Sequence, residues 1–84
     1  MTVNAANWTT RGLIRRRNIG AHIVLETCVG DADVVWTATL CGADATGLGA
    51  RQRIEPTQAA AEAAAEAAIV AVIARLSADV ADLV

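Results

Sequence analysis

The sequence contains no Phe, Tyr or Lys and only two Trp in 84 residues, so large aromatic side chains cannot build its core. A chain of this length forms one small domain that buries only roughly 60% of its unfolded surface. We therefore predict a single domain over residues 1–84 with a core of Val, Ile, Leu and Ala. Its strands are expected within 8–54 and its helix over about 56–76, with a continuation to 83 left open. Residues 1–6 are expected to be disordered.

Residues that carry chemistry are scarce, because the chain has one His and two Cys. A structural zinc site needs four ligands. In the strand register derived below, Cys28 and Cys41 lie roughly 20 Å apart, and a disulfide needs Cα atoms within about 7 Å. His22 faces Cys41, and such a pair can generate a thiolate nucleophile, but no acid or oxyanion loop accompanies it. We predict free thiols, no metal, no cofactor and no enzymatic activity.

Two further sequence features exclude other classes. The Gly-rich segment 42–49 has neither the spacing nor the Lys of a phosphate-binding P-loop, so it is expected to be a hairpin loop. The longest apolar run, Ala67 to Ala74, covers about eight residues, and crossing a bilayer takes roughly twenty. The first twenty residues lack the apolar core of a signal peptide. These features predict a soluble, cytoplasmic protein with no membrane partner.

Alternation of apolar and polar residues predicts strands over 22–29 and 34–41, joined by a turn at 30–33. Pairing Val29 with Val34 sets Ile23 opposite Leu40 and aligns one apolar face across both strands. A further strand is expected over 47–54, with Leu48 opposite Leu40, and another over Trp8 to Arg17, turning at 18–20. The predicted fold is α+β, an antiparallel meander of three or four strands followed by one long helix packed on one face.

The Ala-rich segment after Pro56 predicts that helix, because Ala has the highest helix propensity and Pro suits a first turn. Six residues fall within about 80° of one another on the helical wheel: Glu62, Glu66, Ile69, Ile73, Leu76 and Val80. The opposite side is smooth, with Ala60, Ala64, Ala67, Ala71 and Ala74. Either the Ala side packs on the sheet and leaves the large residues uncovered, or the large residues pack inward and the two glutamates lie beyond the sheet's edge. We predict a homodimer interface at Ile69, Ile73, Leu76 and Val80.

Charge is distributed unevenly along the chain. Residues 1–54 carry six arginines against four acids, and residues 55–84 carry one arginine against five acids. The six arginines are the predicted partner-binding residues: Arg11, Arg15, Arg16, Arg17, Arg51 and Arg53. The alternative is a solvated edge strand protected by charge. If the arginines do form a binding surface, its partner is acidic, either a protein or a nucleic acid. A protein partner is favoured, because nucleic-acid binding also calls for stacking aromatics and the chain offers only Trp8 and Trp36.

Residues 34–76 resemble the second half of a double-stranded RNA-binding domain. The likeness rests on a strand, a turn, the segment Gly47-Leu48-Gly49 and an Ala-rich helix beginning near Gln58. The resemblance implies a sheet-plus-helix fold. That family grips phosphates with lysines at the start of this helix, where this chain has Glu55, Pro56, Thr57 and Gln58. The resemblance therefore argues against RNA binding.

In size, acidity and absence of catalytic motifs the chain also resembles small phage-encoded inhibitor proteins such as anti-CRISPRs. This resemblance implies a protein-binding module, specifically a phage or mobile-element inhibitor of a host defence complex. Two alternatives stay open at this point. One is a dimeric regulatory or ligand-sensing domain, and the other is nucleic-acid binding through the arginines.

Overall fold

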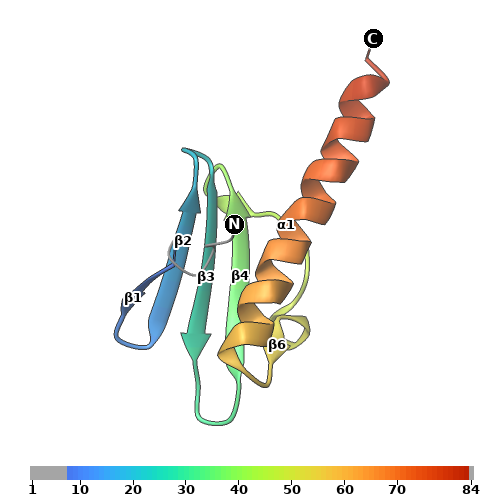
Figure 1. The fold of residues 1–84 in the computed structure, drawn as a ribbon. Helices are drawn as coiled ribbons and strands as arrows, with labels where there is room; N and C mark the ends of the chain where they lie inside the picture. The colour runs from blue at the N-terminus through green and yellow to red at the C-terminus, as the bar shows by residue number, and fades with distance from the viewer. Residues whose placement is uncertain (1–7, 84) are drawn as a thin grey trace.

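The computed structural model describes residues 8–83, which form an antiparallel sheet with one long helix across one face (Figure 1). The strands are β1 (Thr9–Arg11), β2 (Ile14–Ile19), β3 (Ile23–Val29), β4 (Val34–Leu40), β5 (Ala43–Asp44) and β6 (Ile54–Glu55). A short 3₁₀ turn, Ala50–Gln52, precedes β6, and the helix α1 spans Gln58–Ala81. The strand order is β1-β2-β3-β4-β5, with β6 also paired to β4. The α+β architecture predicted from the sequence is confirmed.

The central hairpin of β3 and β4 has the predicted register. Val29 pairs with Val34, Ile23 with Leu40 and Leu25 with Ala38. The face of the hairpin that this register aligns is the one beneath the helix, where Leu25, Trp36 and Ala38 are buried. Strict alternation on both sides of a short turn made this pairing unambiguous, since a slip by one residue would expose the whole apolar face.

The single strand expected over Trp8 to Arg17 is instead a second hairpin. β1 and β2 pair around a turn at Gly12 and Leu13, with Arg11 opposite Ile14. Gly12 has φ +64°, a conformation that glycine adopts without the Cβ penalty of other residues. The turn expected at 18–20 lies slightly later, after β2 ends at Ile19. The predicted disorder of residues 1–6 falls outside the described part of the chain.

The prediction of a strand over 47–54 is wrong. On the side of β4 that faces away from β3, two short segments pair with it, Ala43–Asp44 at one end and Ile54–Glu55 at the other. Between them the chain leaves the sheet, because the Asp44 carboxylate accepts hydrogen bonds from the backbone N–H groups of Thr46 and Gly47 at 3.2 and 3.1 Å. These bonds hold a loop where a returning strand was expected, so Leu48 does not pair with Leu40.

The helix begins one residue after Thr57, whose Oγ accepts a hydrogen bond from the Ala60 N–H at 3.1 Å. Thr57 is thus the N-cap, and it satisfies one of the amide groups that a helix start leaves without a partner. Pro56 lies just before the helix instead of in its first turn. The helix then runs without interruption through Ser77 to Ala81.

The helix packs on the sheet through a face that lies between the two alternatives predicted from the wheel. Its buried residues are Ala61, Ala65, Ile69 and Val72. The first three of these residues form one core cluster with Trp8, Leu25, Val34, Trp36 and Ala38. Small side chains at the start of this face let the helix approach the two bulky indoles closely. On the side of the helix that carries only Ala, Ala67, Ala71 and Ala74 are exposed, so this side does not pack on the sheet there.

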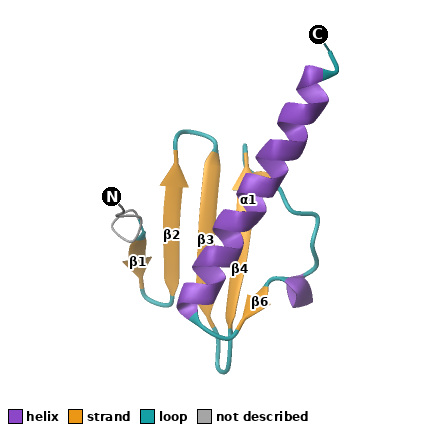
Figure 2. Ribbon diagram, turned by 45° about the vertical axis from the view of Figure 1, so that its right-hand side comes forward, coloured by secondary structure: helices purple, strands orange, loops and turns teal. Residues whose placement is uncertain are grey.

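The helix is longer than the sheet that it covers, and its C-terminal half extends past the sheet (Figure 2). The last buried helix residue is Val72, and every described residue after it, 73–83, is exposed. We call residues 73–83, which are the end of α1 and the turn that follows it, the projecting half. Among the described residues, no helix combines the length and hydropathy needed to cross a bilayer.

Candidate interaction surface on the projecting helix

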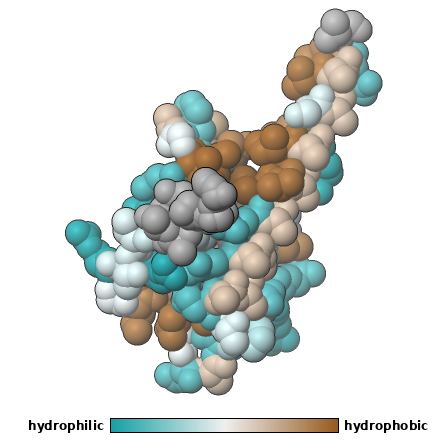
Figure 3. Space-filling model, in the orientation of Figure 1, coloured by the Kyte–Doolittle hydropathy of each residue, from teal (hydrophilic) through white to brown (hydrophobic). Residues whose placement is uncertain are grey.

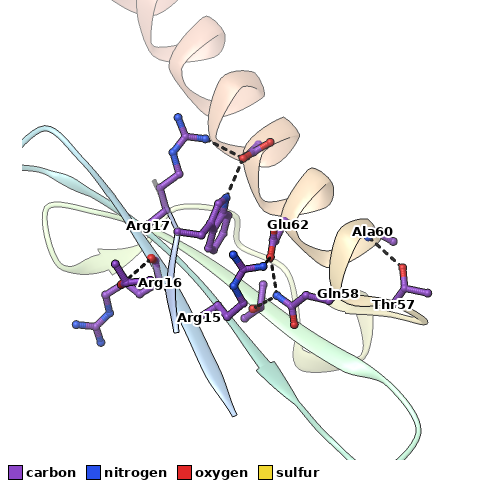
Figure 4. Close-up of polar contacts among 11 residues, drawn as sticks. Arg15, Arg16, Arg17, Thr57, Gln58, Ala60 and Glu62 are labelled. Carbon is purple, nitrogen blue, oxygen red and sulfur yellow. Dashed lines mark hydrogen bonds and ion pairs between the residues drawn. The ribbon is translucent and has the colours of Figure 1, made fainter. Parts of the chain in front are cut away.

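The arginines of β2 divide between the two faces of the sheet, because successive strand side chains point to opposite sides. Arg15 and Arg17 point toward the helix, and Arg16 lies on the other face (Figure 4). Arg15 forms an ion pair with Glu62, and these side chains are 27% and 15% exposed. Arg17 Nη1 lies 2.8 Å from Glu66 Oε2. Arg16 Nε donates to Glu26 Oε2 at 2.8 Å within the sheet.

The ion pairs belong to a wider polar network between β2, β3 and α1. Gln58 Nε2 donates to Thr27 Oγ1 at 2.6 Å and to Glu62 Oε2 at 2.9 Å. Trp8 Nε1 donates to Glu66 Oε2 at 3.3 Å, and the Arg15 guanidinium carbon lies 5.9 Å from the centroid of the Trp8 ring. A cation within about 6 Å of an indole face is attracted to it. The network therefore joins the acidic half of the helix to the sheet.

The structure does not gather the six predicted partner-binding arginines on one surface. Arg15 and Arg17 are engaged by the helix, and Arg16 by Glu26. Arg11 lies on β1, at one edge of the sheet, whereas Arg51 and Arg53 lie beside β6, toward the other edge. Within residues 8–83 the arginines are therefore divided between the two faces and the opposite edges of the sheet.

The predicted dimer-interface residues also divide. Ile69 is 5% exposed and belongs to the core of the domain, so the expectation that it lies on an uncovered stripe is wrong. Ile73, Leu76 and Val80 are 38%, 42% and 58% exposed. The sheet ends near Ile69, so the same side of the helix is covered before that point and uncovered after it.

Sequence reasoning missed Leu83, which is 83% exposed and lies in the turn that follows α1. The signal was present in the spacing, because Ile73, Leu76, Val80 and Leu83 follow one another at steps of three and four residues. We call these four residues the seam. Figure 3 shows apolar side chains along the projecting half of α1 and beside it at the adjoining end of the sheet. Half-buried Ile19 and Ile23, at the β2–β3 end of the sheet, pack against the core.

The remaining candidates for chemistry lie apart from the seam. Cys28 and Cys41 are both free and exposed. The predicted facing of His22 and Cys41 is confirmed by the backbone, since the Cys41 N–H donates to the His22 carbonyl at 2.7 Å. Hydrogen bonds from Thr46 and Gly47 lower the pKa of Asp44 below its usual value of 3.8. Within residues 8–83, no three Cys, His, Asp or Glu side chains come together as potential metal ligands.

Comparisons with protein-family models, curated proteins and solved structures give no match to this chain. The fold and the surface define a two-layer domain in which polar contacts anchor one half of a helix and the other half presents a row of large apolar side chains.

Proposed function

We propose that this chain is a non-enzymatic protein-binding module that contacts its partner through the projecting half of α1. The observation that carries the proposal is the seam, where four large aliphatic side chains lie at the end of α1 and in the turn after it, and the domain itself leaves them exposed. Burying a side chain of this kind contributes roughly 1.5–3 kcal/mol, so contact with another apolar surface is strongly favoured.

The projecting half also lacks tertiary support of its own. Helices shorter than about 12–15 residues are marginal in water, and packing of an apolar face supplies most helical stability in proteins. A partner that covered the seam would provide that packing. Amphipathic helices bind protein grooves and other helices in this way, through anchors spaced three and four residues apart.

The anchored half of the helix supports the same proposal. The pairs of Glu62 with Arg15 and of Glu66 with Arg17 connect the helix to β2. They hold the projecting half at one angle, which reduces the ordering cost of binding. The narrower hypothesis, an inhibitor of a host defence complex, stays a prediction from the resemblance described above.

Site-specific photo-crosslinking in the source cells tests this proposal. A photo-reactive side chain at Leu76, on the seam, should yield a covalent adduct with another chain on irradiation. The same group at Ala78 is the matched control, because Ala78 is exposed on the opposite side of the helix. Absence of an adduct at position 76, or equal adducts at both positions, would contradict the proposal.

A further inference from the structure

We infer that the partner on the seam is a second copy of this chain, bound as an antiparallel pair of helices. This inference rests on the proposed function, because it names the occupant of the same surface.

The spacing of the seam selects a helix as the partner. One row of large aliphatic residues has steps of four, three, four and three: Ile69, Ile73, Leu76, Val80 and Leu83, with Val70 and Val72 lying beside this row. This repeat of 3.5 residues is that of the a and d positions of a coiled coil, whose side chains insert between those of a facing helix. A seam with this spacing is complementary to a second seam with the same spacing. A second copy of the chain supplies such a seam.

Burial within the domain sets where the two helices overlap. Ile69 is already covered by its own sheet, so the shared part begins at Ile73. An antiparallel pair that uses all four seam residues sets Ile73 opposite Leu83 of the second copy and Leu76 opposite Val80. The end of the second helix then reaches the end of the sheet where β2 finishes at Ile19 and β3 begins at Ile23, two half-buried residues that pack against the core.

The position of the sheet requires the antiparallel direction. On the helical wheel the seam lies roughly 45° from the face that packs on the sheet, so a partner helix occupies the sheet side of α1. A parallel partner would bring its own sheet to the same place and would set Glu62 and Glu66 of the two copies side by side. In an antiparallel pair the sheet of the second copy lies at the opposite end of the helix pair, and Glu62 and Glu66 stay paired with Arg15 and Arg17.

Oligomeric state is the first test, measured by size-exclusion chromatography with light scattering and by analytical ultracentrifugation. The purified chain at tens of micromolar should have twice its 8.7 kDa mass. Leu76→Asp should raise the dissociation constant at least tenfold, equivalent to about 1.4 kcal/mol. Ala78→Asp adds the same charge on the opposite side of the helix and should remain dimeric. A wild-type monomer throughout this range would overturn the inference, as would equal dissociation of both variants with their circular dichroism unchanged.

Direction is tested by a photo-reactive side chain at Ile73 of the purified chain, followed by trypsin. Cleavage after Arg53 and Arg75 separates Ile73, in peptide 54–75, from Leu83, in peptide 76–84. A covalent dimer that joins peptide 54–75 to peptide 76–84 supports the antiparallel pair, and one that joins peptide 54–75 to itself overturns it. If the adduct formed in cells at position 76 contains a different protein and no second copy, this inference fails while the proposed function stands. If position 76 forms no adduct at all, both fail.

Discussion

Replacing Glu62 with Lys should lower the free energy of unfolding by about 2–4 kcal/mol, measured by urea denaturation. Removing one partner of a buried ion pair costs about 3–5 kcal/mol, and the partial exposure of Arg15 and Glu62 reduces that figure. The substitution also sets a like charge against Arg15 and removes an acceptor from Gln58. Total stability of a small domain is roughly 5–15 kcal/mol, so the loss is a large fraction of it.

Glu26→Lys is the matched control for this prediction. Glu26 pairs with Arg16 on the uncovered face of the sheet, where both side chains are more exposed than in the pair of Arg15 with Glu62. Exposed ion pairs contribute about 0–1 kcal/mol, so this reversal should have a small effect. Exchanging the charges, Arg15→Glu with Glu62→Arg, should recover part of the lost stability. Equal, small losses for Glu62→Lys and Glu26→Lys would show that the network does not anchor the helix.

Replacing Ala65 with Leu should destabilise the fold by about 1–3 kcal/mol, because Ala65 is fully buried against the sheet and a larger side chain forces the helix away from the indoles. Ala67→Leu introduces the same side chain on the exposed side of the same helix and should change stability by no more than about 0.5 kcal/mol. Thermal or urea unfolding of the two variants measures both losses of stability, and their difference reports which face of the helix packs on the sheet. A larger loss for Ala67→Leu would contradict the packing face described here.

Local pattern was sufficient to predict the hairpin and the helix. Val29 and Val34 flank a short turn, and one register alone aligns the apolar residues of both strands, so the pairing followed directly from alternation. The helix followed from its alanines, which favour that conformation whatever they pack against. These elements are determined by residues close together in the sequence.

Elements that depend on distant residues were not predicted correctly. The segment after β4 alternates well enough for a strand, but hydrogen bonds to the Asp44 carboxylate hold it as a loop. The helical wheel predicted that either the Ala side packs on the sheet or the large residues pack inward and Glu62 lies beyond the edge of the sheet. The structure avoids both outcomes, because Arg15, 47 residues away in sequence, meets Glu62 over β2. Nothing in the local pattern pairs those two residues.

The candidate surface was predicted in part for the same reason. Ile73, Leu76 and Val80 were chosen from the wheel and are exposed in the structure, whereas Ile69 is covered because the sheet extends that far. The length of a sheet relative to its helix is a tertiary property. The basic cluster was interpreted as a surface from sequence adjacency, although alternation along β2 sends neighbouring arginines to opposite faces.

Hydrogen–deuterium exchange of the projecting half at several protein concentrations tests most directly whether it is a contact surface for another chain. Amides of residues 74–81 should exchange slowly at high concentration and become faster on dilution, because the helix end gains its packing from a partner. Leu76→Asp should exchange fast at every concentration, while Ala78→Asp should follow the wild type. Exchange that is independent of concentration and identical in all three proteins would contradict a second copy as the partner on the seam.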